Sequence, residues 1–462
     1  MSTAATTLDR AVGPARIPVD IGHAVYAAVT DPDTAFWALV DKTRIAEEIS
    51  AGPLLDSYRA KAADFARELH ALRFELTPSG VYLNPTERCN LNCTYCYLPG
   101  EQRSSGSHMS TDKLIASLAK LRDYFRSVMP EGRKPRAIFH GAEPLMNKTA
   151  VFAAIDAFSD DFVFGLQTNG TLLDDEAVEF LTSRNVSIGL SLDGPVAGIT
   201  DATRQTWGGK SVHDKVLAAM DKLKGYGSWS VITTCTTENL PYLTQMVELF
   251  HAKEVPTCML NTLRCTLPGA RGVKPADADM VKAFFAAMDR THELYRETGR
   301  KLLVANFANF ANIVIGILAP TARRLMCDIS PCGGGRAFFA LAADGGLYPC
   351  SEFIGLPRFN GGNLLADGGV EAALTSEAFS SVITRDVDKF SPCGDCAIRH
   401  FCGSPCPAEA AEMNGGMDKI GAFCEFYKEQ VNYALRLIAD GKADDYLWDG
   451  WDEDTETTFL MQ

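Results

Sequence analysis

The sequence contains no run of roughly 18 consecutive apolar residues, the length that a helix needs to cross a bilayer. Basic residues are the minority charge: 44 Lys and Arg stand against 58 Asp and Glu, the net charge is -14, and no basic cluster occurs. The N-terminus lacks the apolar segment of a secretory signal. These absences predict a cytoplasmic protein with neither a membrane nor a nucleic acid as partner, because a phosphate backbone requires a basic surface.

Cysteine, by contrast, is abundant, with 14 residues in the chain. In a reducing compartment disulfides are rare, so clustered cysteines more often bind metal. Cys235, Cys258 and Cys265 stand alone and are interpreted as small buried hydrophobic residues. The remaining cysteines fall into two tight groups, which predicts metal centres in two parts of the chain.

The pattern of apolar residues divides the chain into four segments. Residues 1–80 show three- and four-residue spacing and are predicted to be helical, either as a cap on the next domain or as a peptide-docking element. Residues 81–318 alternate β-rich runs with helical stretches, which indicates parallel βα units. Residues 319–430 are rich in Gly, Pro and Cys, typical of a metal-stabilised domain. Residues 431–462 form an acidic tail that is either disordered or docked on the barrel.

Six strands and seven helices are predicted in the second segment. The strands are expected near residues 81–85, 136–140, 162–167, 186–191, 229–235 and 257–263. The helices are expected near 110–128, 147–158, 174–184, 211–225 and 239–252, followed by 276–298 and 304–318. Six such units predict an α/β fold, a partial (β/α)6 TIM-like barrel, either open or closed, with ligands at the carboxyl ends of the strands.

The first cysteine group directly follows the first predicted strand. It has the pattern Cys-x3-Cys-x2-Cys and consists of Cys89, Cys93 and Cys96, with Tyr95 before the last cysteine. Three thiolates can hold three corners of a 4Fe–4S cube and leave one iron open; a zinc site short of one ligand is the alternative. The motif resembles that of the radical S-adenosylmethionine superfamily. The resemblance implies that S-adenosylmethionine chelates the open iron and yields a 5′-deoxyadenosyl radical, which abstracts a hydrogen atom from carbon.

Two further motifs resemble those with which that superfamily binds S-adenosylmethionine. GAEP follows the second strand, with Ala142 in place of the family's second glycine, and its Glu143 is expected to pair with the methionine ammonium. QTNG, with Thr168 and Asn169, ends the third strand.

The fourth strand ends in SLDG, whose Ser191 and Asp193 are expected to face the ribose hydroxyls. Arg204 follows and is a candidate for the methionine carboxylate, because its planar guanidinium suits that geometry. Each motif alone is weak, and QTNG and SLDG could simply be turns. Their order and spacing together support the resemblance over residues 81–263.

The second cysteine group spans residues 327–424. Its eight members are Cys327, Cys332, Cys350, Cys393, Cys396, Cys402, Cys406 and Cys424. They resemble the seven-cysteine SPASM extension of peptide-modifying radical enzymes, with Cys327 as an eighth. The resemblance implies two auxiliary 4Fe–4S clusters, one held by Cys327, Cys332, Cys350 and Cys406 and the other by Cys393, Cys396, Cys402 and Cys424. The return of Cys406 to the first of these cannot be read from spacing, and two zinc sites are the alternative.

The residue after Cys350 bears on the reaction. Anaerobic sulfatase maturases, which this region resembles, carry an Asp there, whereas this chain has Ser351 and then Glu352. The difference argues against formylglycine formation. Glu352 is a candidate catalytic base or peptide contact; a solvated loop carboxylate with no role is the alternative.

A SPASM extension implies a polypeptide substrate, either a ribosomally made precursor peptide or a small protein subunit. The chain looks similar to thioether-forming peptide maturases and to the maturase of the quinohemoprotein amine dehydrogenase small subunit, which links Cys sulfur to Asp or Glu carbon. We therefore expect an intrapeptide Cys-to-carbon thioether, formed with a reductant such as flavodoxin or ferredoxin. Carbon–carbon cross-linking and formylglycine-type oxidation are the alternatives.

Three other classes remain open from the sequence. A non-catalytic iron–sulfur electron carrier would need the cysteines but not the barrel motifs. A zinc-stapled interaction protein would account for the second cysteine group alone. A radical enzyme acting on a small molecule would share the barrel and its motifs.

Overall fold

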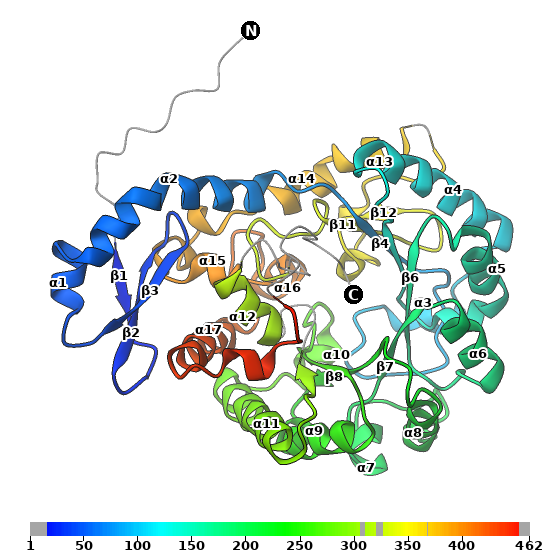
Figure 1. Cartoon of the computed structure of the whole chain (residues 1–462). Helices are drawn as coiled ribbons and strands as arrows, with labels where there is room; N and C mark the ends of the chain where they lie inside the picture. Colours follow the sequence, from blue (N-terminus) through cyan, green and yellow to red (C-terminus); the bar gives the residue numbers. More distant parts are fainter. Residues whose placement is uncertain (1–15, 305–309, 320–326, 367, 452–462) are drawn as a thin grey trace, which may run out of the picture.

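The computed structural model of the chain describes residues 16–304, 310–319, 327–366 and 368–451. Figure 1 shows a curved arrangement of helices around a parallel sheet, with an N-terminal sheet and long helix at one end. In the described part of the chain, no helix is both long and apolar enough to cross a membrane.

The central sheet has nine strands in the order β10-β9-β8-β7-β6-β5-β4-β11-β12. Their bounds are β4 Gly80–Leu83, β5 Arg136–Phe139, β6 Val163–Thr168, β7 Ser187–Ser191, β8 Trp229–Cys235, β9 Thr257–Thr262, β10 Leu303–Val304, β11 Phe338–Leu341 and β12 Leu347–Tyr348. Neighbouring strands from β10 to β11 are parallel, and β12 pairs with β11 antiparallel. The α/β barrel prediction is confirmed in its open form, and all six predicted strands are present.

Helices between the strands cover the outer face of the sheet. The larger ones are α4 Thr111–Val128, α5 Lys148–Phe158, α6 Asp175–Ser183, α8 His213–Lys222, α9 Leu243–Ala252 and α11 Asp277–Thr298. Helix α4 begins where the Ser110 hydroxyl accepts a hydrogen bond from the Lys113 N–H, and α6 begins at Asp174, whose carboxylate accepts from the Ala177 N–H. Such caps satisfy N–H groups that the first helical turn leaves unpaired.

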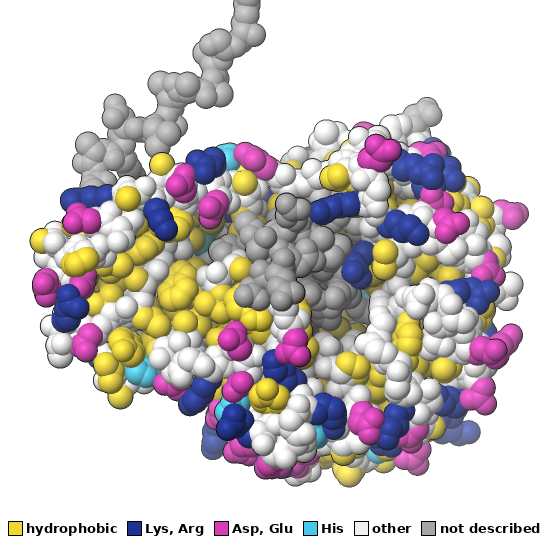
Figure 2. Space-filling model, viewed as in Figure 1, with side chains coloured by type: hydrophobic (Ala, Val, Ile, Leu, Met, Phe, Trp, Pro, Cys, Tyr) yellow, Lys and Arg dark blue, Asp and Glu magenta, His cyan; other side chains and the backbone are white. Residues whose placement is uncertain are grey.

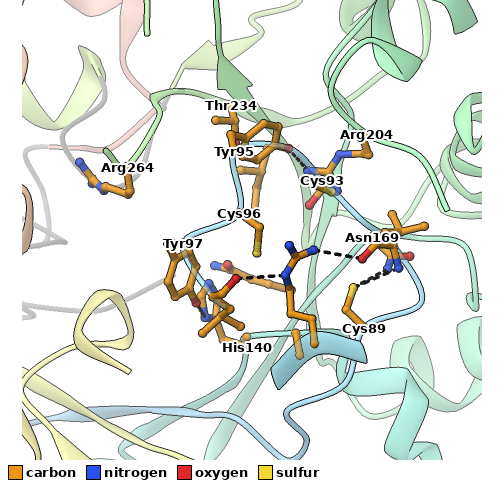
Figure 3. Close-up of a pocket in the computed structure, with 18 of the residues that line it drawn as sticks. Cys89, Cys93, Tyr95, Cys96, Tyr97, His140, Asn169, Arg204, Thr234 and Arg264 are labelled. Carbon is orange, nitrogen blue, oxygen red and sulfur yellow. Dashed lines mark hydrogen bonds between the residues drawn. The ribbon is translucent and has the colours of Figure 1, made fainter. Parts of the chain in front are cut away.

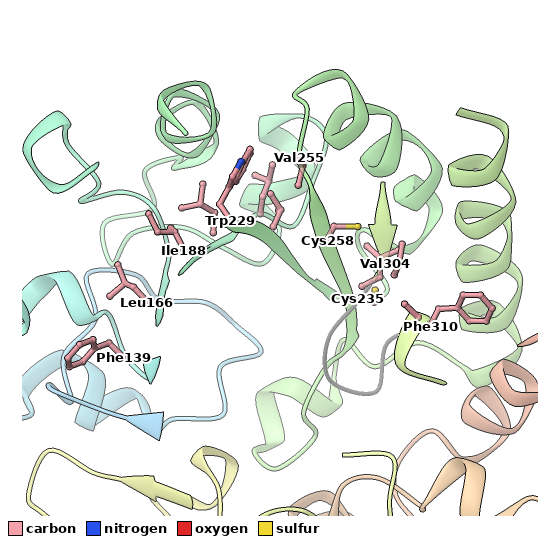
Figure 4. Packing of buried hydrophobic residues seen from close by; sticks show 14 of the residues in the cluster. Phe139, Leu166, Ile188, Trp229, Cys235, Val255, Cys258, Val304 and Phe310 are labelled. Atoms are coloured by element: carbon pink, nitrogen blue, oxygen red, sulfur yellow. The ribbon is translucent and has the colours of Figure 1, made fainter. Parts of the chain in front are cut away.

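The core fills the space between this sheet and its helices. Figure 4 shows part of it near strands β8 to β10, where Cys235, Cys258 and Val304 lie close together. Cys235 and Cys258 lie in this core, and both are fully buried. Cys265 is fully buried as well. The interpretation of the three isolated cysteines as buried hydrophobic residues is therefore confirmed.

The cysteine-rich segment does not form a separate body with its own sheet. Strand β11 from that segment pairs in parallel with β4, the first barrel strand, with Phe338 opposite Gly80 and Leu341 opposite Leu83. Short helices follow: α13 Gly369–Leu374, α14 Glu377–Ile383, α15 Arg399–Cys402 and α16 Pro407–Asn414. The sheet thus continues from the barrel into the cysteine-rich segment.

The N-terminal segment differs from its prediction. Three strands, β1 Ile17–Val19, β2 Tyr26–Asp31 and β3 Phe36–Asp41, form an antiparallel sheet before helices α1 Ile45–Ser50 and α2 Pro53–Phe74. The prediction of an all-helical region is wrong for residues 17–41. The stretch FWALVD carries aromatic and β-branched residues that pack well on a pleated surface.

The predicted boundary at residue 431 is also wrong, because it falls inside helix α17, Cys424–Ala439. That helix packs against α11 and α12 Phe310–Leu318. The chain continues along the surface, where Leu447 is fully buried and the Lys301 ammonium donates to the Leu447 carbonyl at 2.9 Å. The start of the acidic tail is therefore docked; residues 452–462 lie outside the described residues.

Buried ion pairs join the N-terminal helix α2 to the cysteine-rich domain. Arg73 donates to the Ser330 carbonyl at 2.8 Å, to Asp388 at 2.8 Å and to Asp386 at 2.5 Å. Arg399 donates to the second Asp388 oxygen at 2.5 Å. Burial opposes ionisation of Asp388, yet His400, Arg73 and Arg399 hold the pKa of that carboxyl well below its usual range.

Replacing Arg73 by Ala is expected to lower the free energy of unfolding by about 3–5 kcal/mol, because Asp386 would lose its closest cation and keep only the more distant Lys389, at 3.7 Å. Thermal unfolding of the anaerobic protein measures this loss. Arg67→Ala, on the same helix, removes an exposed pair with Asp64 and is expected to cost at most about 1 kcal/mol. Equal effects of the two substitutions would contradict the role given to Arg73.

Candidate functional site

A cavity of about 210 Å³ opens at the carboxyl ends of the barrel strands. Figure 3 shows how its labelled residues lie around it. Residues after successive strands line it: Cys89, Cys93, Tyr95, Cys96 and Tyr97 after β4, His140, Gly141 and Ala142 after β5, Thr168 and Asn169 at β6, Ser191 at β7, Thr234 at β8, and Asn261, Thr262 and Arg264 at β9. Glu352, from the cysteine-rich domain, completes the wall.

The loop with the first cysteine group is held from both sides. The Cys89 N–H donates to the Arg103 carbonyl at 2.9 Å, and the Thr94 N–H donates to Thr203 at 2.9 Å. The Cys89 sulfur accepts from the Asn169 side-chain amide at 3.8 Å. All three cysteines therefore face one cavity, as their spacing predicts.

Behind this loop lies a buried group formed by Tyr95, Asp193 and Arg204. Arg204 Nε donates to Asp193 Oδ2 at 2.9 Å, and the Tyr95 hydroxyl donates to the same oxygen. The other Asp193 oxygen accepts from the Thr234 N–H at 2.9 Å. Burial lowers the pKa of Arg204, but Asp193 and Tyr95 more than offset it, so the guanidinium stays charged.

Asp193 is fully buried and does not line the cavity, whereas Ser191 does. Of the two SLDG residues, Ser191 is thus the one placed to meet a ligand. Asp193 instead orients Arg204, which reaches the cavity from behind Cys93.

Glu143 is also fully buried behind the wall. Its carboxylate accepts from the Thr168 hydroxyl at 2.8 Å, the Asn169 N–H at 2.8 Å and the Leu145 N–H at 3.0 Å. Burial raises the pKa of Glu143, and these donors oppose the rise. The carboxylate therefore fixes the QTNG turn; its predicted pairing with the methionine ammonium stays a prediction.

The two residues before Glu143 have left-handed backbone conformations. Gly141 has φ 73°, and a Cβ there would meet the Asn84 side chain at 2.1 Å. Ala142 has φ 45°, although it occupies a position where the family has glycine. The left-handed conformation costs alanine roughly 1–2 kcal/mol. The turn nevertheless has this conformation at Ala142.

The cysteines of the second group gather into two neighbourhoods. Burial raises the pKa of Cys327, and Cys332, Cys350 and Cys406 raise it further by their charge. Burial likewise raises the pKa of Cys402, and Cys424, Cys393 and Cys396 add to the effect. The cysteines that raise the pKa of Cys327 and of Cys402 belong to the two predicted sets, and the assignment of ligands to each cluster stays a prediction.

Five cysteines share one local arrangement, in which the backbone N–H two residues later hydrogen-bonds to the sulfur. The pairs are Leu91 with Cys89, Leu98 with Cys96, Gly334 with Cys332, Glu352 with Cys350 and Ser404 with Cys402. Burial raises the pKa of each thiol, and the N–H group lowers it by stabilising the thiolate. The N–H groups thus offset part of the effect of burial on each thiol.

The donor set of both cysteine groups consists of thiols. Thiolates are the preferred ligands of iron–sulfur clusters, and in a 4Fe–4S cube each thiolate binds its own iron. The cysteines therefore fit such clusters by their chemistry, and the assignment of individual ligands stays a prediction.

The far wall of the cavity holds residues that the sequence did not single out. Tyr97 and His140 lie together, with 3.3 Å between the hydroxyl and Nδ1, and burial lowers the pKa of His140 to about 4, so the ring is neutral. Arg264 lies opposite Glu352, with 3.8 Å between Nε and Oε1. Arg264 lies just after strand β9, and this position at the carboxyl end of a barrel strand is the feature of the sequence that could have identified it as a site residue.

Comparison with known proteins agrees with this site. The model of the radical SAM superfamily matches residues 83–250. An uncharacterized protein of Archaeoglobus fulgidus is 40% identical over 410 residues, which cover 89% of this chain and 92% of the relative. A cysteine-type anaerobic sulfatase-maturating enzyme of Clostridium perfringens is 22% identical over 381 residues, which cover 79% of this chain and 98% of that enzyme.

A solved structure has the same fold over most of the chain. That structure, anSMEcpe with bound AdoMet and the Cp18Cys peptide, superposes with a TM-score of 0.68 at 20% identity, covering 79% of this chain and 99% of that one. The chain belongs to the radical S-adenosylmethionine superfamily and is an enzyme of that class. Its cysteine-rich C-terminal domain is of the SPASM type, found in maturases that carry auxiliary 4Fe–4S clusters.

Replacing Asp193 by Asn is expected to weaken S-adenosylmethionine binding about 10- to 100-fold. The substitution removes a charged acceptor worth about 1.5–3 kcal/mol and releases Arg204 from its orientation. Calorimetric titration of the reconstituted enzyme measures the dissociation constant. Asp214→Asn, whose side chain is 96% exposed, is the control. An unchanged affinity in the Asp193 variant would refute the positioning role.

Proposed function

We propose that this enzyme modifies a ribosomally made precursor peptide or a small protein subunit, and that it forms a Cys-to-carbon thioether within that polypeptide. The observation that carries the proposal is the composition of the cavity. One wall presents the first cysteine group, and the far wall joins the last barrel strands to the SPASM domain through Arg264 and Glu352. A substrate there would lie between the first cluster and an auxiliary one.

Arg264 and Glu352 offer hydrogen bonds that suit a peptide group. Among the residues that the structure describes, one guanidinium nitrogen of Arg264 and the Oε2 atom of Glu352 are buried and have no hydrogen-bond partner. A peptide unit supplies both complements, since its carbonyl accepts and its N–H donates. Buried polar atoms without partners are costly, so a ligand that pairs both would bind here favourably.

The residues that would hold the cofactors follow from the geometry above. Cys89, Cys93 and Cys96 would bind the open cluster, and the two neighbourhoods of the second cysteine group would bind the auxiliary clusters. Arg204, Ser191, Thr168, Asn169 and Tyr95 would surround S-adenosylmethionine. When bound, these groups supply the 5′-deoxyadenosyl radical and an acceptor for one electron.

Thioether formation removes two hydrogens from the substrate, one from the thiol and one from carbon. One hydrogen leaves as an atom. The other leaves as a proton, and its electron passes to an acceptor. Glu352 is the candidate proton acceptor, because burial raises its pKa to about 7 while Arg264 opposes the rise. A carboxylate with a pKa near the working pH is suited to accept a proton.

Sulfatase-type oxidation is the second candidate, favoured by the similarity to the sulfatase-maturating enzyme of Clostridium perfringens. Against it stands Ser351, which replaces the Asp of those enzymes. Ser351 is buried, and its hydroxyl lies 3.8 Å from the Cys350 sulfur, outside the cavity wall. The neighbouring Glu352 is the carboxylate that reaches the cavity.

The N-terminal sheet could dock the polypeptide. Within the described residues, β3 pairs with β2 alone, which leaves an edge suited to an added strand. Figure 2 shows hydrophobic side chains gathered at the surface where this sheet and α17 are drawn in Figure 1. A flavodoxin or ferredoxin is the proposed reductant.

Incubation of the enzyme with reductant, S-adenosylmethionine and a Cys-bearing peptide encoded beside its gene is expected to yield a product lighter by two hydrogen atoms. Mass spectrometry of the product tests this. A thioether retains the sulfur, whereas formylglycine formed from cysteine has lost it. An aldehyde product, or no product with any neighbouring peptide, would overturn thioether formation.

Glu352→Gln is expected to reduce product formation at least about tenfold, because the amide cannot accept the proton. Formation of 5′-deoxyadenosine should persist, since the radical is generated at the opposite wall. Glu238→Gln, an exposed substitution after β8, is the matched control. Loss of both products in the Glu352 variant would instead indicate a structural role.

Iron analysis tests the cluster assignment independently of substrate. About twelve irons and twelve sulfides per chain are expected from three 4Fe–4S sites. Replacing Cys89, Cys93 and Cys96 together by Ala is expected to leave about eight of each. Zinc in place of iron, or a complete loss of iron in this variant, would contradict the assignment.

A further inference from the structure

Arg385 lies at the centre of the SPASM domain, in the turn between α14 and the short helix Val387–Lys389. It is only 5% exposed. A buried cation requires compensation by hydrogen bonds and by negative charge. Both are present, and both come from the segments that carry the auxiliary cysteines.

The guanidinium is fixed by four hydrogen bonds to two of these segments. It donates to the Ser404 carbonyl at 2.9 Å and the Ser404 hydroxyl at 3.0 Å, between Cys402 and Cys406 in the sequence. It also donates to the carbonyls of Met417 at 2.8 Å and Lys419 at 2.7 Å. The charge is therefore held in one place.

Electrostatic neighbours of Arg385 come from both cysteine sets. Burial lowers the pKa of Arg385, and Cys332, Cys393, Cys406 and Cys402 raise it by their charge. Two of these belong to the set containing Cys327 and two to the set containing Cys424. In return, Arg385 lowers the pKa of Cys332 and of Cys393 against the effect of burial.

Two other arginines, Arg336 and Arg264, act on the set that contains Cys327. Arg336 donates to the Cys332 carbonyl at 3.0 Å and lowers the pKa of that thiol. Burial raises the pKa of Cys406, and Arg264, which lines the cavity, lowers it. Arg385 differs from both because its charge acts on each set.

We propose that Arg385 is a positioning residue for electron transfer, a shared cation that raises the reduction potentials of both auxiliary clusters. A cluster with four thiolates is anionic, and reduction adds a further negative charge. A fixed cation nearby in a low-dielectric interior stabilises the reduced form more than the oxidised form. The proposal rests on the cluster ligands assigned above and not on the identity of the substrate.

The test uses the full chain with Cys89, Cys93 and Cys96 replaced by Ala, so that only auxiliary clusters give signals. Redox titration followed by electron paramagnetic resonance gives both midpoint potentials. In Arg385→Gln, the equilibrium constant for reduction of each cluster is expected to fall about tenfold, equivalent to about 59 mV for one electron. Arg358→Gln, an exposed arginine of the same domain, is expected to leave both potentials unchanged.

Arg385→Lys separates charge from structure, because lysine retains the charge but cannot make all four hydrogen bonds. The midpoint potentials of both clusters in this variant are expected to match those of the parent protein, which retains Arg385, at neutral pH. This comparison holds even if Arg385→Gln fails to retain iron. Unchanged potentials in the Gln variant, or a lowering in the Lys variant equal to that in Gln, would overturn the proposal. A parent protein without auxiliary iron would instead refute the cluster assignment.

Discussion

The pairing of β11 with β4 is the interaction on which the arrangement of the whole site depends. Strand β4 leads directly into the loop of the first cysteine group, and the β11–β12 hairpin leads directly to Cys350 and Glu352. The Asn84 N–H extends the pairing by donating to the Leu341 carbonyl at 2.9 Å. Because β12 runs antiparallel to β11, the chain turns back along the first barrel strand before it reaches Cys350 and Glu352, and Glu352 lines the same cavity as the first cysteine group. Two segments separated by some 250 residues thus face one cavity.

The second constraint is charge in the interior. The cysteine loops are buried, and burial disfavours thiolates unless a metal or a cation accompanies them. The chain places Arg204 near the first group and Arg264, Arg336 and Arg385 near the second, each bound to backbone or carboxylate oxygens. Backbone N–H groups directed at sulfur supplement them. Although acidic residues are in excess in the whole chain, the cysteine loops are thus accompanied by buried cations.

Much of the barrel could be predicted because its strands are short, apolar and separated by helices of regular spacing. The N-terminal strands could not, since Phe36–Asp41 combines helical spacing with side chains that favour sheets. Motifs showed which residues belong to the site but not their depth. Glu143 and Asp193 lie behind the wall, where each accepts three hydrogen bonds from neighbouring strand ends and loops. The set to which Cys406 belongs depends on the direction taken by the short loop of residues 403–406, which spacing does not encode. Arg264 belongs to no motif, and only the fold brings it opposite Glu352.

The sheet has two ends, β10 and β12, and its described strands do not close into a ring. The interior of such a sheet is filled by side chains, so a ligand reaches the cavity at the carboxyl ends of the strands and does not pass through the sheet. An internal residue of the proposed polypeptide substrate can therefore approach the cavity without a free chain end. The position of the modified residue along a polypeptide is then limited by what the enzyme recognises, and not by the distance from a terminus.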